Sequence, residues 1–164
     1  MRRGVMTTSP DRAFLFAHPA HFLALGFGVG LASKAPGTLG TLIGLPIHLL
    51  IHDLPALAYW GLMLLGGLIG IWACDRTGRA LGVEDHGGIV WDEIVAFVLV
   101  LHFAPQTWAG YLLAFVLFRL FDVWKPFPIG WCEARVQGGV GVMLDDVLAA
   151  GYTILCLMGV AAWM

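Results

Sequence analysis

Long apolar runs, separated by short polar clusters, form the main pattern along the chain. The stretches Ala35–His52, Leu54–Cys74 and Val147–Met164 contain 18, 21 and 18 residues and no charged side chain. An α-helix rises 1.5 Å per residue, so about 20 apolar residues cross the hydrocarbon core of a bilayer, which is about 30 Å thick. The pattern therefore predicts membrane-spanning helices.

A fourth stretch, Ile94–Phe118, has 25 uncharged residues but carries His102, Pro105 and Gln106 near its centre. One long kinked helix and a tight hairpin of two shorter helices both fit this sequence. We favour the hairpin, because His-Phe-Ala-Pro-Gln is a poor mid-membrane segment and a reasonable turn. Each arm would have about 16 residues and reach about 24 Å, which is short for a bilayer.

Polar or glycine-containing segments join these runs. Arg76–Ile89 and Trp124–Gly141 are predicted connectors, and Asp145 and Asp146 are expected to open the last helix. The segment Ala13–Ser33 is expected to be interfacial or re-entrant, because three glycines weaken a helix there. We predict an all-α, polytopic membrane bundle of about four to five membrane helices, formed by one domain over residues 1–164.

The composition supports a lipid environment. Hydrophobic residues make up 59% of the chain and charged residues 12%, with a mean hydropathy of +0.83. A soluble domain has roughly 25% charged residues, so we expect this chain to be embedded in a lipid bilayer. A net charge of −2 without a basic stripe argues against nucleic-acid binding. The three cysteines form no CxxC pair, which argues against a zinc site or a disulfide framework.

Counting the crossings places most of the charges at one face of the membrane, which we call the charged face. All six lysines and arginines from Lys34 onward fall there, and the opposite loops around His52–Asp53 and Phe103–Gln106 contain none. By the positive-inside rule, the charged face is cytoplasmic. The same count gathers eight acids there: Asp75, Glu84, Asp85, Asp92, Glu93, Asp122, Asp145 and Asp146.

Five of these acids are the candidate metal ligands. Carboxylates near a membrane are costly unless they are hydrated, paired or bound to metal, and an oxygen-rich cluster suits Mg²⁺. An acid in a first helical turn can also simply interact with the helix dipole, so either pair alone would fit that structural role. Convergence of two pairs and a fifth acid favours the metal site: Asp92, Glu93, Asp122, Asp145 and Asp146.

Cations accompany these acids. Arg119, Asp122 and Lys125 follow one another at i, i+3 and i+6 near a helix end, which fits either a surface salt-bridge cluster or phosphate binding by the two cations. Two glycine-rich segments, Ser33–Thr41 and Gly138–Gly141, precede predicted helices, and exposed N–H groups at helix starts can bind anions. Lys34 and a predicted N-cap at Thr38 make the first segment a substrate-binding candidate, although a simple turn and cap would fit as well.

Four motifs, taken together, resemble the phosphatidylglycerophosphatase A family. They are Lys34-Ala35-Pro36-Gly37-Thr38-Leu39-Gly40-Thr41, Trp91-Asp92-Glu93-Ile94-Val95, the segment Phe118–Ile129, and the segment Gly138–Asp146. The likeness runs in order from about Gly26 to Tyr152. Ser33 stands where the family pattern leads us to expect proline, and Glu133 where we expect aspartate, so neither is expected to be a site residue.

The resemblance implies a bacterial inner-membrane enzyme that needs Mg²⁺ and hydrolyses phosphatidylglycerophosphate, a membrane phospholipid, to phosphatidylglycerol and phosphate. In the mechanism we expect, Asp92, Glu93 and Asp146 act with the bound metal to activate a water, although the motifs are also compatible with a covalent aspartyl-phosphate. The phosphates of the head group are bound by Lys34, Thr38, Arg119 and Lys125. Asp85 is expected to support the metal ligands or to act as a general acid.

A small transporter or channel subunit is the alternative from another class. It would need ionisable groups near the bilayer midplane, whereas these groups lie at the ends of the predicted helices. A non-catalytic membrane scaffold is a further alternative, but it gives no reason for acids clustered beside phosphate-binding cations.

Overall fold

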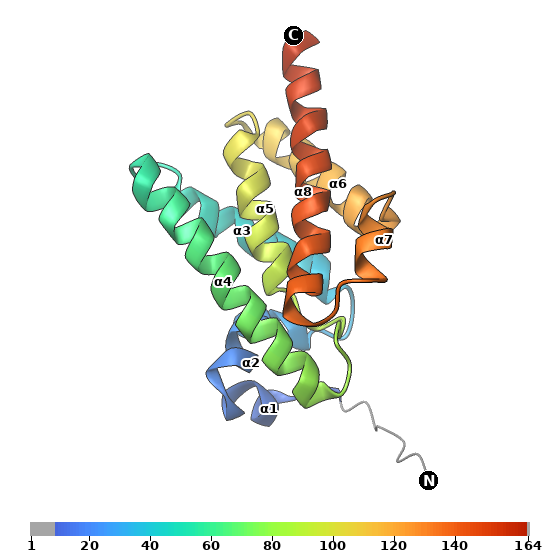
Figure 1. Ribbon diagram of the computed structural model, residues 1–164. Helices are drawn as coiled ribbons and strands as arrows, with labels where there is room; N and C mark the ends of the chain where they lie inside the picture. Colours follow the sequence, from blue (N-terminus) through green and yellow to red (C-terminus); the bar gives the residue numbers. More distant parts are fainter. Residues whose placement is uncertain (1–8, 164) are drawn as a thin grey trace.

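The computed structural model describes residues 9–163, so Met164 of the predicted last span lies outside the described residues. Within this range the chain is all α-helical (Figure 1). The elements are α1 (Arg12–Ala17), α2 (Pro19–Ala24), the 3-10 helix η1 (Gly26–Leu31), α3 (Pro36–Ile51), α4 (Ala56–Leu81), α5 (Trp91–Phe103), α6 (Trp108–Trp124), α7 (Ile129–Glu133) and α8 (Gly138–Trp163).

The predicted hairpin is confirmed, since α5 and α6 are separate helices joined by a four-residue turn. Gln106 closes this turn by donating from Nε2 to the carbonyl oxygens of Leu101 and Ala104, at 3.1 and 2.9 Å. Thr107 then caps α6, because its hydroxyl accepts the N–H of Gly110 at 3.1 Å. Gln106 and Thr107 therefore satisfy free backbone groups at the two helix ends that meet in this turn.

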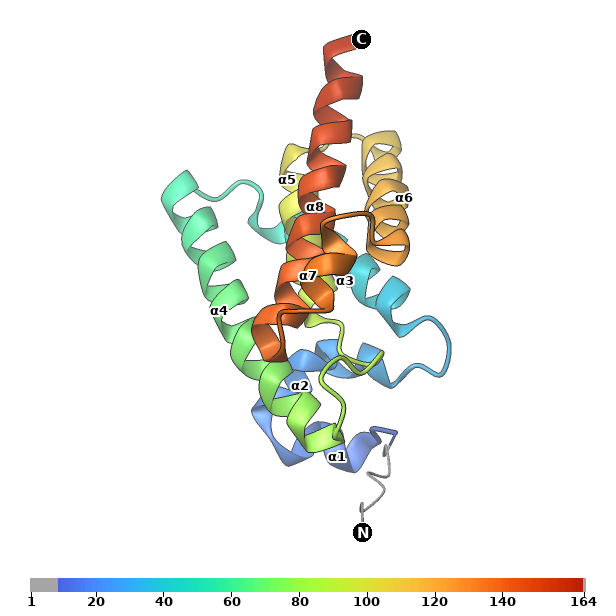
Figure 2. The same cartoon turned by 45° about the vertical axis from the view of Figure 1, so that its right-hand side comes forward.

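Helix α5 lies at the centre of the bundle, against α3, α8 and α6 (Figures 1 and 2). Phe97 of α5 and Phe118 of α6 are almost fully buried, with ring centroids 5.7 Å apart. On the α3 side, Gly44 has no side chain, and a Cβ there would lie 3.1 Å from the Phe97 ring. Close helix packing of this kind needs small residues at the contact.

Helix α4 leans away from the bundle axis and leaves much of its surface uncovered (Figure 2). Leu57, Leu64 and Leu68 are among its exposed apolar side chains. By length and hydropathy, two of the described helices could cross a membrane: Ala56–Leu81 and Gly138–Ala162. An exposed apolar surface of this extent fits a protein that associates with a membrane.

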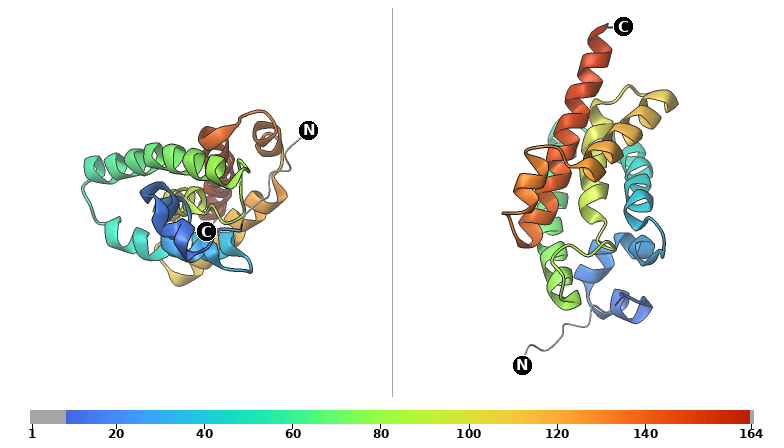
Figure 3. Two further views of the ribbon diagram at one scale, coloured as in Figure 1. Left: turned by 90° about the horizontal axis from the view of Figure 1, so that it is seen from below. Right: turned by 90° about the vertical axis from the view of Figure 1, so that its right-hand side faces the viewer.

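The segment expected to be interfacial or re-entrant forms α1, α2 and η1, which pack beneath the bundle, at the end of α4 (Figure 3). His21 of α2 is buried, and its Nδ1 lies 3.0 Å from the Thr77 hydroxyl of α4. The N–H of Val90, just before α5, donates to the Ala24 carbonyl oxygen at 2.8 Å. The N-terminal segment thus supports the start of α5.

Three predicted boundaries are wrong. Helix α4 continues beyond Cys74 to Leu81, because Asp75 and Arg79 are compatible with a helix and form an i, i+4 ion pair at 3.0 Å. Helix α8 begins at Gly138, so Asp145 and Asp146 lie about two turns inside it rather than at its start. The predicted connector before α8 also contains the short helix α7.

The helix ends are arranged as the crossing count predicted. The starts of α3, α5 and α8 and the ends of α4 and α6 lie toward the same end of the bundle (Figure 1). At the opposite end, His48 of α3 lies 3.3 Å from the Gln106 amide oxygen, and His102 stacks on Tyr59 of α4. His48 and His102 therefore take part in packing, away from the acids of the charged face.

Candidate active site

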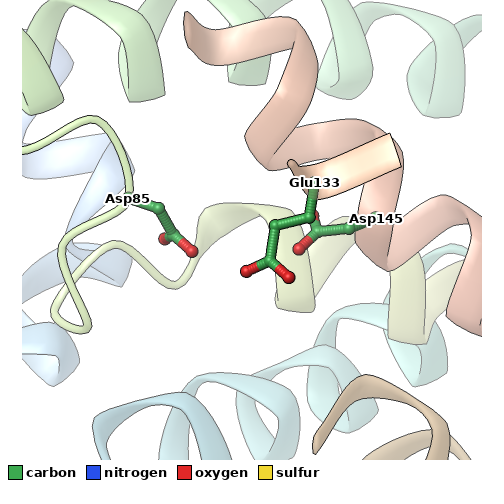
Figure 4. Close-up of side chains that lie close together, drawn as sticks. All are labelled: Asp85, Glu133 and Asp145. Atoms are coloured by element: carbon green, nitrogen blue, oxygen red, sulfur yellow. The ribbon is translucent and has the colours of Figure 1, made fainter. Parts of the chain in front are cut away.

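Three carboxylates from separate elements converge beside the N-terminal half of α8 (Figure 4). Asp85 comes from the loop after α4, Glu133 from α7 and Asp145 from α8, and one oxygen of each lies within 4.8 Å of the others. Lys125 joins two of them, because its ammonium group donates to Glu133 and to Asp145, both at 2.7 Å. We call these four residues the outer cluster.

Lys125 is directed into this cluster by the way α6 ends. It follows the last residue of the helix and adopts a left-handed backbone conformation, with φ of 47°. This conformation is costly for a residue other than glycine and ends α6 abruptly. The chain then turns through Pro126 and Pro128 into α7, which brings Glu133 back beside Lys125.

A second group of charges, which we call the inner cluster, joins α3, α5 and α6. The Arg119 guanidinium donates to Glu93 Oε1 at 2.7 Å and forms an ion pair with Asp122 one turn further along α6. The Thr41 hydroxyl of α3 lies 3.5 Å from the same guanidinium nitrogen and donates to the Gly37 carbonyl oxygen at 2.9 Å. The inner cluster thus consists of Thr41, Glu93, Arg119 and Asp122.

Asp92 and Asp146 lie between the two clusters and are almost fully buried, with exposed fractions of 6% and 3%. They interact electrostatically with each other and with acids of both clusters. Asp92 Oδ1, Asp146 Oδ2 and Glu93 Oε2 are buried and have no hydrogen-bond donor among the described residues. Buried carboxylate oxygens without donors are costly, so this arrangement fits a site that a cation completes.

Electrostatics favour a charged Lys125 and make Asp85 harder to ionise than a free aspartate. Burial would lower the pKa of Lys125, but its hydrogen bonds to Asp145 and Glu133 raise that pKa above its usual value. Desolvation raises the pKa of Asp85, and Lys125 opposes this effect only in part. Asp85 therefore holds its proton more tightly than an aspartate in water does.

The structure brings together most of the predicted site residues. The six acids proposed for metal binding or catalysis and the cations Arg119 and Lys125 all lie in or between the two clusters. Lys34 is exposed in the loop before α3 and makes no ion pair within residues 9–163. The predicted N-cap at Thr38 is wrong: α3 is preceded by Ala35, and Thr38 lies inside its first turn.

Glu133 is the site residue that the sequence reasoning set aside. Its position after Trp131 was judged only by the expected residue type, and an acid one methylene longer still reaches Lys125 across the turn. Opposite charges on the two sides of the Pro126–Pro128 turn were the signal that could have indicated this contact. Thr41 was also missed as a partner of Arg119.

The glycines of the two predicted anion-binding turns lie inside helices. Gly37 and Gly40 belong to the first turns of α3, and Gly139 and Gly141 to the first turn of α8. A Cβ on Gly139 would overlap the Ile71 carbonyl oxygen of α4. Gly139 therefore allows close contact between α8 and α4, and anion binding at the two helix starts stays a prediction.

Comparison with known proteins supports a single family. The model of the family described as Phosphatidylglycerophosphatase A matches residues 22–161. The chain is 42% identical to "Phosphatidylglycerophosphatase A" of Escherichia coli (strain K12) over 134 residues, which cover 81% of this chain and 78% of that protein. It is 40% identical to the protein of the same name from Haemophilus influenzae, over 95% of this chain and 97% of that one.

A third relative carries a different name. The "Putative phosphatidylinositol-3-phosphatase" of Bacteroides thetaiotaomicron is 39% identical over 150 residues, 87% of this chain and 92% of its own length. No solved structure matches the chain significantly. The match of the family model over most of the chain, together with the first two relatives, shows that the chain belongs to the phosphatidylglycerophosphatase A family.

Proposed function

We propose that the protein is a phosphoric monoester hydrolase that converts phosphatidylglycerophosphate to phosphatidylglycerol and phosphate. Family membership over residues 22–161 supports the substrate. The single observation that carries the chemistry is the pair of buried aspartates, Asp92 and Asp146, each with a carboxylate oxygen that has no donor among the described residues. Such a site attracts a divalent cation and an anionic phosphate at once.

The residues present fit Mg²⁺. Mg²⁺ prefers oxygen ligands, and three buried carboxylate oxygens lack any other partner in the described part of the chain. Asp92, Glu93 and Asp146 would hold the ion, with Asp122 and Asp145 completing the set. Bound Mg²⁺ would neutralise the phosphomonoester and lower the pKa of a water molecule.

The chain's own residues would orient the head group. Arg119 belongs to the inner cluster and Lys125 to the outer cluster. Each would give up part of its pairing with carboxylates and bind phosphate oxygens instead. Lys34 and Thr38, at the entry to α3, would contact the second phosphate of the substrate. The acyl chains would remain in the lipid.

The hydrolysis would use direct attack by water. The water oxygen bonds to phosphorus and gives up one proton, while the bond from phosphorus to the glycerol oxygen breaks. The leaving oxygen takes up one proton, so the products are the alcohol and hydrogen phosphate. We assign delivery of that proton to Asp85, whose carboxylate lies near those of Glu133 and Asp145, and the proton given up by the water restores it (Figure 4). No residue in the two clusters needs to become covalently phosphorylated for this reaction to balance.

We further propose a multi-pass arrangement in the bacterial inner membrane, with α3, α4, α5, α6 and α8 crossing it and the site on the cytoplasmic side. The exposed apolar surfaces of α4 and α8 support the membrane placement. The charged face carries Arg76, Arg79 and Arg135 as exposed cations, which the positive-inside rule assigns to the cytoplasm. Asp92, Glu93 and Asp122 lie near helix ends rather than at mid-membrane, which argues against a transporter.

The test is phosphate release by the purified protein in detergent, with and without Mg²⁺ after treatment with EDTA. The substrates are phosphatidylglycerophosphate, phosphatidic acid and phosphatidylinositol 3-phosphate. We expect Mg²⁺-dependent turnover of the first, at a kcat/KM at least about tenfold above the others. Equal or faster turnover of phosphatidylinositol 3-phosphate would contradict the proposed substrate. Turnover insensitive to EDTA would contradict the role of a metal in the mechanism.

A further inference from the structure

The carboxylate of Glu93 lies directly against the backbone of α3, at Gly37. A Cβ built on Gly37 would overlap Glu93 Oε1 and lie 2.8 Å from both Cδ and Oε2. No real side chain approaches a carboxylate that closely. The space that any other residue would fill at position 37 is therefore the space that the carboxylate of Glu93 occupies.

Gly37 differs in this respect from the glycines that follow it in α3. A Cβ on Gly40 would lie 2.6 Å from the Cβ of Val90 and 3.2 Å from Glu93 Oε2, and one on Gly44 would meet the ring of Phe97 and the Ile94 carbonyl oxygen. Val90, Phe97 and the Ile94 backbone belong to the core and cannot move without repacking the helices. Gly37 alone among the three faces only the end of a flexible, charged side chain.

Arg119 fixes Glu93 from the other side. Its guanidinium donates to Oε1 at 2.7 Å and is itself held by Asp122 and by the Thr41 hydroxyl. The second carboxylate oxygen, Oε2, is buried and has no donor among the described residues. The arrangement thus uses one oxygen of Glu93 for anchoring and leaves the other free for a ligand.

We infer that Gly37 is a positioning residue of the site: its missing side chain admits the Glu93 carboxylate, which keeps Oε2 directed at the bound cation. This inference rests on the proposed function for its catalytic readout, but the effect of position 37 on cation affinity can be measured without turnover. Helix propensity would favour alanine over glycine here by about 1 kcal/mol. A loss caused by Gly37→Ala would therefore have to come from the displaced carboxylate.

The experiment is a double-mutant cycle with Gly37→Ala and Glu93→Asp, because the shorter acid withdraws the carboxylate from α3. Phosphatidylglycerophosphate turnover, Mn²⁺ affinity by electron paramagnetic resonance and thermal unfolding in detergent are measured for each variant. We expect Gly37→Ala to reduce kcat and Mn²⁺ affinity at least about tenfold with Glu93 present, and less than about twofold in the Glu93→Asp background. Gly61→Ala and Gly159→Ala, where a Cβ would meet nothing within 4 Å, are the matched controls.

Equal losses in the two backgrounds, or wild-type kcat and Mn²⁺ affinity in Gly37→Ala, would overturn the inference. If Gly37→Ala fails to fold and the double variant folds, the Gly37–Glu93 contact is supported. If both variants fail to fold, the contact is ruled out as the cause of the misfolding. Should the wild-type protein bind Mn²⁺ without releasing phosphate, the proposed function fails, while the Mn²⁺ cycle still decides the role of Gly37.

Discussion

The ammonium group of Lys125 donates to Asp145 Oδ2 at 2.7 Å and thereby joins the end of α6 to α8. Asp145 is buried, with 5% of its surface exposed, whereas Glu133, the other partner of Lys125, is exposed. One cation thus compensates a buried and an exposed carboxylate. Lys125 makes both contacts from the left-handed backbone conformation that ends α6 after Trp124.

Replacing this cation is expected to impair the site. In Lys125→Met, Asp145 and Glu133 lose their hydrogen bonds, and bonds to charged groups contribute about 1.5–3 kcal/mol. We predict that kcat/KM for phosphatidylglycerophosphate falls at least about tenfold, measured as phosphate release at saturating Mg²⁺. Arg79→Met, which removes an exposed cation paired only with Asp75, is the control and should retain activity. Full activity of Lys125→Met would show that the cation has no part in turnover.

The packing of α4 against α5 and α8 yields a prediction about stability. A Cβ on Gly70 would lie 2.6 Å from Met143 Sδ and 2.8 Å from the Trp91 ring, which is fixed by its hydrogen bond to the Gly66 carbonyl oxygen. Gly70→Ala should destabilise the fold by about 1–3 kcal/mol in detergent. Gly67→Ala, which would meet nothing within 4 Å, should unfold at or above the wild-type temperature. Equal unfolding temperatures for the two variants would contradict this packing.

The docking of the N-terminal segment should depend on pH through His21. Burial lowers the pKa of His21, with further lowering from His18 and Arg76. The unfolded chain therefore binds a proton at a higher pH than the folded one, so stability is complete above about pH 6.5 and falls as the pH drops toward the folded pKa. Thermal unfolding between pH 5 and 8 should show this loss in the wild type and a weaker one in His21→Gln. Parallel curves for the two proteins would exclude His21 as its source.

The orientation in the membrane can be tested with single cysteines in a background lacking Cys74, Cys132 and Cys156. Arg79→Cys reports on the charged face and Asp53→Cys on the opposite loop, and both native side chains are largely exposed. A membrane-impermeant maleimide should label Asp53→Cys in right-side-out vesicles and Arg79→Cys only in inverted ones. The reverse pattern would place the site outside the cytoplasm.

The sequence was sufficient to predict the helical class, the hairpin and the gathering of charges at one end. Those predictions depended on run lengths, on the turn formed by Pro105 and Gln106, and on alternation of crossings, which need no tertiary detail. The boundaries near Cys74 and Asp145 were wrong, because charged residues and glycines were taken to end helices. In the structure Arg79 remains helical at an exposed position, and Gly139 is helical where α4 leaves no room for a side chain.

Pairing within the site could not be derived from the sequence alone. Spacing placed Arg119 and Lys125 on one side of a helix, whereas the left-handed backbone at Lys125 directs it to a different cluster. The contact of Glu93 with Gly37 joins residues from α5 and α3, and only the packing of those helices reveals it. Such contacts depend on how helices approach, which local patterns do not encode.

The most direct test of the account is Mn²⁺ binding to the metal-free protein, measured by electron paramagnetic resonance for the wild type, Asp92→Asn and Asp146→Asn. Asp53→Asn, on the opposite loop, is the control. We predict that each of the first two substitutions weakens Mn²⁺ binding at least about tenfold, while thermal stability without metal is retained or increased, because a buried charge without a donor is removed. Wild-type Mn²⁺ affinity in both Asp92→Asn and Asp146→Asn would contradict a cation site between the two clusters.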